Sequence, residues 1–169
     1  MSYRIILQQV FVFLLFTGVQ VTLLKNLVLF DTAFCFVYVG FLLFLPFEIG
    51  RTSLLLLGFL LGFVVDVFYD SLGIHAAAGV LIAFIRPAWI NVLTPQGGYE
   101  INASPFIKQT AVTWFVSYTF ALLFIHHTVI FFIEAGGLSI FFFTLVKVFS
   151  STIFTFLVLV LVQLLFYKK

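Results

Sequence analysis

Long apolar runs constrain this chain more than any other feature of its sequence. Leu54–Leu61 and Phe156–Val162 would be apolar on every face of either a helix or a strand. Because the strands of a membrane β-barrel alternate apolar and polar residues, these runs favour helices. The chain is 64% hydrophobic and 8% charged, whereas soluble domains are about half apolar and about a quarter charged. The sequence therefore predicts an all-α integral membrane protein.

The length of the chain predicts about six transmembrane helices in one bundle, as a single domain over residues 1–169. Each crossing takes about 20 residues plus a short loop. The loop with the strongest turn signals is Asn91–Lys108, which contains Thr-Pro, Gly-Gly and Ser-Pro pairs. The expected helices are Ile5–Leu24, Thr32–Phe47, Ser53–Phe68, Ile74–Ile85 with a continuation through Pro87 to Ile90, Gln109–Ile133 and Ser139–Tyr167.

Positive charge sets the expected orientation. With six helices, both termini share one side with the second and fourth loops, and the other side holds only Lys25. The shared side collects Arg4, Arg51, Arg86, Lys108, Lys168 and Lys169. Since cytoplasmic loops carry an excess of Lys and Arg, we expect both termini in the cytoplasm. A net charge of +2 is too small to indicate nucleic acid binding.

The stretch from Gly58 to Pro87 holds the densest polar group inside the apolar body. Gly58 and Gly62 are one helical turn apart, so two helix backbones can approach closely there. Asp66 follows on the same face, and Ser71-Leu72-Gly73 then breaks the helix. We expect a tight helical hairpin whose packing surface or partner interface includes Gly58, Gly62, Asp66, Gly73, His75, Ala76 and Gly79.

Asp66 and Lys147 are the deepest acidic and basic residues of their helices, so we expect them to form an intramembrane ion pair. A charge inside the apolar slab costs about 2.5–3.5 kcal/mol on insertion scales and needs a partner or water. A buried pair that fixes helix register explains both residues. The alternative is a proton or ion site. Such a site would normally need further acidic groups deep in other helices, and the first, second and fifth helices offer none.

The histidines offer a weaker indication of chemistry. His126 and His127 are adjacent and point about 100° apart on a helix, so they would not both face one metal ion. We expect these histidines at the interface or as caps. Asp66 and Asp70 have the spacing of a metal-dependent phosphatidyltransferase, but further aspartates are missing. No Ser-His-Asp set, Walker loop or zincin helix occurs, so we expect no enzyme activity, metal or cofactor.

The hairpin stretch resembles the rod shape-determining protein MreD family. The matching residues are Gly58-Phe-Leu-Leu-Gly62, then Asp66, then Gly73-Ile74-His75 before a helix rich in Ala and Gly. In that family a G-x-x-x-G-x-x-x-D run precedes a short turn, a Gly, often a His, and a small-residue helix. About six helices and cytoplasmic termini fit the family as well.

The resemblance implies a function that no spacing in the chain shows. MreD-like proteins are non-enzymatic inner-membrane scaffolds of the cell-elongation machinery. They act with the bitopic protein MreC, the glycosyltransferase RodA, its partner transpeptidase and the MreB filament.

The family is also said to look like the substrate-binding subunits of energy-coupling-factor transporters. The alternative function is therefore a substrate-binding membrane subunit of a small-solute transporter. An enclosed cavity beside Asp66 and Lys147 would favour that alternative. A filled interior with an exposed apolar groove would favour the scaffold.

Overall fold

The computed structural model describes residues 3–99, 103–137 and 140–166, which are mostly helical. Within this part of the chain, five helices are long and apolar enough to cross a membrane. The protein is therefore a mostly α-helical, multi-pass membrane protein. The elements are α1 (Tyr3–Val19), a short π-helix η1 (Gln20–Leu24), β1 (Val28–Leu29), β2 (Ala33–Phe34), α2 (Val39–Phe44), α3 (Arg51–Tyr69), α4 (Ile74–Val92), α5 (Val112–Glu134) and α6 (Phe141–Phe166).

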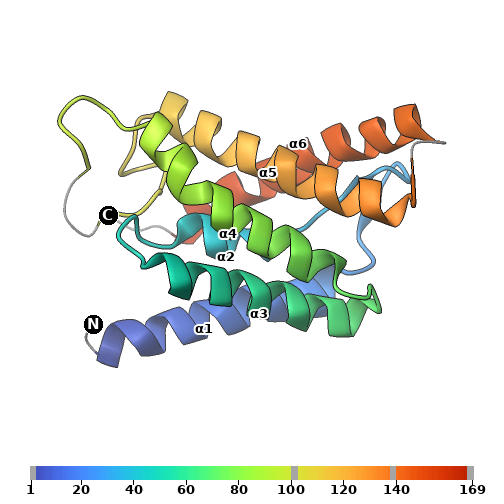
Figure 1. Cartoon of the computed structure of the whole chain (residues 1–169), viewed down its shortest axis with the longest axis horizontal. Helices are drawn as coiled ribbons and strands as arrows, with labels where there is room; N and C mark the ends of the chain where they lie inside the picture. Colours follow the sequence, from blue (N-terminus) through green and yellow to red (C-terminus); the bar gives the residue numbers. More distant parts are fainter. Residues whose placement is uncertain (1–2, 100–102, 138–139, 167–169) are drawn as a thin grey trace.

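The long helices form a bundle with two distinct ends (Figure 1). Helices α1, α3 and α5 run in one direction, and α4 and α6 run back. We call the end with the α4–α5 connection the loop end, and the end with the α3–α4 and α5–α6 connections the turn end. Helix α1 begins and α6 ends at the loop end.

The expected second helix, Thr32–Phe47, is wrong for most of its length. Strands β1 and β2 form a two-stranded antiparallel sheet in which Val28 pairs with Phe34. Residues 35–38 are neither helix nor strand, and α2 has only six residues. The run Phe34-Cys-Phe-Val-Tyr-Val39 is rich in aromatic and β-branched side chains, which favour an extended backbone. The chain thus returns from the turn end toward the loop end through β2, residues 35–38 and α2 (Figure 1).

The other helices lie within a few residues of their expected positions. Helix α3 begins after Gly50, whose backbone is extended, and ends at Asp70 in the left-handed conformation. Helix α4 begins after Gly73, whose φ of +92° favours glycine. Pro87 lies inside α4, which continues to Val92. The expected limits of the last helix, Ser139 and Tyr167, lie outside the described residues.

Helices α3 and α4 pack with almost no space between their backbones. A Cβ atom on Gly58 would lie 2.7 Å from the carbonyl oxygen of Gly79. One on Gly62 would overlap the carbonyl oxygen of His75 and the backbone of Ala76. The small residues of the hairpin therefore contact one another within this chain.

Arg86, which was expected among the cations of the cytoplasmic side, is a buried side chain of α4. Its Nε donates to the Tyr118 hydroxyl at 2.8 Å, and its Nη2 donates to the Leu45 carbonyl. The Tyr118 hydroxyl donates to the Leu43 carbonyl at 2.9 Å. Together these groups satisfy carbonyls at the C-terminal end of α2, where a positive charge is also favoured by the helix dipole.

We expect reporter fusions at Lys169 and within Asn91–Lys108 to report the same compartment, the cytoplasm. The loop end holds the α4–α5 connection, the start of α1 and the end of α6. Arg51 and Lys108 are exposed, and Lys168 and Lys169 lie outside the described residues. Such cations favour the cytoplasmic side. A disagreement between the two fusions would mean that α5 and α6 do not both cross the membrane.

Candidate functional site

A largely buried segment, residues 34–38, crosses the interior of the bundle; it leaves β2 and turns into α2 at residues 37–38, and we call it the extended segment. Cys35, Phe36, Val37 and Tyr38 are each at most 4% exposed. Non-helical backbone at membrane depth is tolerated only where protein or enclosed water satisfies its polar groups. Side chains of α6 and η1 do so here. Ser151 Oγ accepts from the Phe34 N–H at 2.9 Å and Thr155 Oγ1 from the Phe36 N–H at 3.1 Å.

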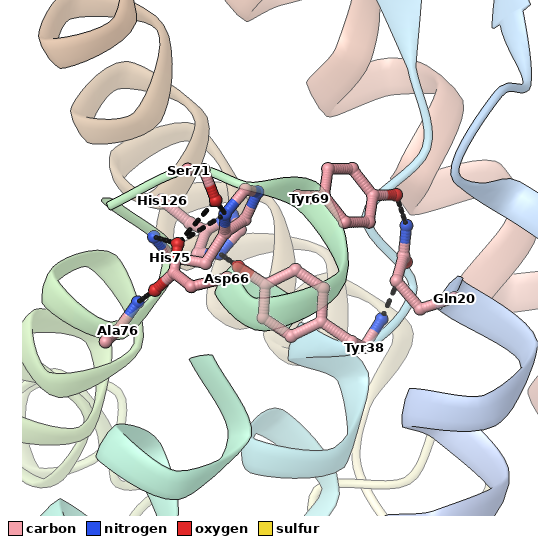
Figure 2. A network of polar contacts seen from close by, with 8 residues as sticks. All are labelled: Gln20, Tyr38, Asp66, Tyr69, Ser71, His75, Ala76 and His126. Carbon is pink, nitrogen blue, oxygen red and sulfur yellow. Dashed lines mark hydrogen bonds and ion pairs between the residues drawn. The ribbon is translucent and has the colours of Figure 1, made fainter. Parts of the chain in front are cut away.

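Gln20 also supports this segment. Its Nε2 donates to the Cys35 carbonyl at 3.0 Å, and its Oε1 accepts from the Tyr38 N–H at 3.3 Å. Nε2 also donates to the Tyr69 hydroxyl at 2.7 Å, as Figure 2 shows. One amide thus joins η1, the extended segment and α3.

Replacing Thr155 with Val is expected to destabilise the protein by about 1–3 kcal/mol, because it leaves the buried Phe36 N–H without an acceptor. Thr152→Val is the matched control. Thr152 is equally buried, but its hydroxyl bonds only the Val148 carbonyl of its own helix. Thermal unfolding in detergent should show a clearly larger loss for Thr155→Val. Equal losses would argue against an extended segment at this position.

Asp66 forms a clasp between α3 and the start of α4 (Figure 2). Its Oδ1 accepts from Ser71 Oγ at 2.6 Å and from the backbone N–H of His75 at 3.0 Å. Its Oδ2 accepts from the backbone N–H of Ala76 at 2.8 Å. A carboxylate is favoured at a helix N-terminus, where backbone N–H groups have no partner inside the helix. We call Asp66, Ser71, His75 and Ala76 the α3–α4 clasp.

The expected ion pair between Asp66 and Lys147 does not form. Asp66 instead contacts His75 Nδ1 at 3.0 Å, and Lys147 Nζ lies 3.9 Å from Glu134 Oε2. The Lys147 ammonium also lies 5.1 Å from the centre of the Phe34 ring. Donors from the nearby turn surround the Asp66 carboxylate, so it needs no distant cation. Similar depth in the bundle was not sufficient to pair the two residues.

His126 and His127 are fully buried, which corrects their expected interfacial or capping positions. His126 Nε2 shares a 2.7 Å hydrogen bond with the Tyr38 hydroxyl, and His127 Nε2 lies 3.2 Å from Thr155 Oγ1. The two rings thus bond different partners. Within the described residues, no three His, Cys, Asp or Glu side chains are grouped to hold a metal ion. Two buried ring nitrogens, His75 Nε2 and His126 Nδ1, have no hydrogen-bond partner among the described residues.

The surface of the described residues includes a groove and a cleft. A groove of about 760 Å³ at the loop end runs between α1, the α2–α3 connection and α3. It is mainly apolar, and its lining includes Gln9, Val10, Phe13, Leu57 and Leu60. A cleft of about 420 Å³ lies at the turn end. Neither is lined by Asp66 or Lys147.

The residues of the G-x-x-x-G-x-x-x-D run meet in one place, whereas Lys147 lies apart from them. Gly58, Gly62 and Gly79 are at the α3–α4 contact, and Gly73 allows the turn between the helices. Sequence reasoning missed the support of the extended segment by Ser151 and Thr155. Hydroxyl residues inside the apolar last helix were the available signal. Comparison with protein-family models, curated proteins and solved structures finds no match.

Proposed function

We propose that the protein is a non-enzymatic membrane scaffold of the bacterial cell-elongation complex, similar in role to MreD proteins. It binds an MreC-like membrane protein in the inner membrane. Through this MreC-like partner, the protein supports a RodA-like glycosyltransferase with its transpeptidase and links to the MreB filament. One observation carries this proposal: the residues that resemble the family motif form a single structural unit, the close contact and clasp of α3 and α4. They hold the α3–α4 hairpin in one close arrangement.

The partner helix must bind away from the motif, because α4 already covers Gly58 and Gly62. The groove at the loop end is the best candidate. Gln9 lies in its wall, and its amide has no hydrogen-bond partner among the described residues. In lipid, such an amide finds a partner on a neighbouring helix. Gly50 and Ser53 also line the groove and allow a second helix to approach closely.

The single transmembrane helix of the MreC-like partner fits this groove better than lipid alone. Glu48 is exposed at the groove, at the end that we expect to face the cytoplasm. A single-span protein usually carries Lys or Arg just beyond the cytoplasmic end of its helix. The carboxylate of Glu48 complements that charge, and the amide of Gln9 supplies a polar contact deeper in the membrane.

Filling the groove tests this assignment. Leu57→Trp places a large ring in the groove, whereas Leu157→Trp changes an exposed position on α6. We expect Leu57→Trp to lower recovery of the MreC-like partner about tenfold, since overpacking a contact costs about 1–3 kcal/mol. Both variants should keep the thermal midpoint of the isolated protein. If both lower recovery equally, or neither does, the groove is not the partner site.

The turn-end cleft is the observation that favours the alternative, a substrate-binding subunit of a small-solute transporter. The two functions separate in one purification from native membranes. Cell-wall synthesis proteins that copurify support the scaffold. An ATPase module in their place supports the transporter subunit.

A further inference from the structure

Helix α1 is the most exposed of the five spanning helices. It lies at the edge of the bundle (Figure 1). Of its membrane-spanning segment, Ile6–Leu24, 11% is buried inside the protein, against 28–44% for the other four. Its inner side carries Thr17, which is buried, and leads to the buried Gln20 of η1. The outer side of α1 therefore faces lipid or another transmembrane helix.

Four residues form a line along this outer side, which we call the α1 seam: Gln8, Phe11, Leu15 and Gly18. The first three are exposed, and a Cβ atom on Gly18 would meet nothing within 4 Å. The residues follow one another at steps of three, four and three positions. This is the spacing with which two helices pack along their length at a small crossing angle.

Gln8 gives the α1 seam one specific polar group. The residue lies inside the spanning segment, and its amide has no hydrogen-bond partner among the described residues. In lipid, such an amide is stabilised by a hydrogen bond to a neighbouring helix. Because an amide has both an acceptor oxygen and NH₂ donors, it is complementary to an identical amide. A single polar residue in an apolar seam also fixes the register of two paired helices.

A second copy of this chain places the matching amide at the required depth. Copies of a membrane protein share one orientation, so the two-fold axis of a dimer is perpendicular to the membrane. Each residue of α1 then lies at the same depth as its counterpart. Gly18, further along the seam, lets the two backbones approach closely. We propose that the protein forms a symmetric dimer in which the two α1 helices pair in parallel along the α1 seam and the Gln8 amides bond each other.

The α1 seam is distinct from the loop-end groove. The groove is lined on α1 by Ile6, Gln9, Val10 and Phe13, none of which belongs to the seam. Gln8 and Gln9 are adjacent, so their side chains point about 100° apart on the helix. The dimer proposal therefore stands independently of the scaffold function, and the two glutamines separate the two contacts experimentally.

Cysteine cross-linking in native membranes locates the contact. Leu15→Cys places a thiol on the seam, and Leu14→Cys places one beside it, at a residue that is more exposed, 60% against 48%. Cys35 is buried, so the wild-type chain gives the background. Under a mild oxidant, Leu15→Cys should form a covalent dimer, and Leu14→Cys should stay close to the background. Equal cross-linking at the two positions would mean random collision and would overturn the proposal.

Two glutamine variants test the polar contact by energy transfer between labelled copies of the full-length protein in lipid vesicles. Gln8→Leu should weaken dimerisation about tenfold, because it removes the hydrogen bonds between the two amides. Gln9→Leu changes the adjacent residue, which faces the groove, and should leave dimerisation unchanged. Gln8 is exposed, so its replacement leaves the packing of the monomer intact. A protein that stays monomeric at every density in the vesicles, or equal dimerisation of the two variants, would overturn the proposal.

Discussion

A single methyl group added at Gly62 is expected to destabilise the protein by about 3 kcal/mol or more. In Gly62→Ala the new Cβ would overlap the carbonyl oxygen of His75 and the backbone of Ala76. These are backbone atoms at the start of α4 and cannot rotate away as a flexible side chain could. The two helices would have to separate, which would also pull the Asp66 carboxylate from the N–H groups that it accepts.

Gly18→Ala is the matched control, because Gly18 is also helical and a Cβ there meets nothing within 4 Å. Alanine favours a helix over glycine by about 1 kcal/mol, so Gly18→Ala should be neutral or stabilising. Thermal unfolding in detergent and the protein level in the membrane compare the two variants. A neutral Gly62→Ala would contradict the close contact between α3 and α4.

Asp66→Ala is expected to have the second largest effect, a loss of about 3 kcal/mol or more. The substitution removes the acceptor of the Ser71 hydroxyl, of two backbone N–H groups and of His75 Nδ1. Each buried donor left unpaired costs about 1–3 kcal/mol, part of which water at the nearby turn recovers. Asp66→Asn should lose less, because one oxygen remains an acceptor. The measurement is again the unfolding midpoint in detergent.

Double-mutant cycles identify the partner of Asp66. Asp66→Asn with Lys147→Met should be additive, because these two side chains do not meet and Lys147 contacts Glu134. Asp66→Asn with Ser71→Ala should show a coupling energy of about 0.5–3 kcal/mol, as contacting residues do. Coupling to Lys147 together with additivity to Ser71 would contradict the clasp.

Most of the helical fold could be predicted from the sequence, because long apolar segments and helix breakers such as Gly73 are local signals. The segment Phe34–Tyr38 could not be assigned in this way. A short apolar run has the same composition whether it forms a buried helix or a buried extended strand. Side chains elsewhere in the chain decide between the two structures. Ser151, Thr155 and Gln20 supply the hydrogen bonds that a non-helical backbone needs at this depth.

The polar contacts of the candidate site were harder to predict than its glycines. The spacing of Gly58 and Gly62 predicted a close helix contact, because a helix places residues four apart on one face. The partner of Asp66 was missed, because the position of a residue along the helix axis does not tell which side of the helix its side chain faces. The turn determines the partner, since it brings Ser71 and the first N–H groups of α4 to the carboxylate. His126 and His127 could not be placed, because burial in the centre depends on how every helix packs.

Site-specific photo-cross-linking in native membranes tests the scaffold account most directly. A photoreactive amino acid at Leu57 lies in the loop-end groove, and one at Leu157 on exposed α6 is the control. Mass spectrometry identifies what each position captures. The account predicts that Leu57 captures the membrane helix of a single-span, MreC-like protein and that Leu157 captures only lipid. Capture of an ATPase-linked transporter subunit at Leu57, or of lipid alone at both positions, would contradict it.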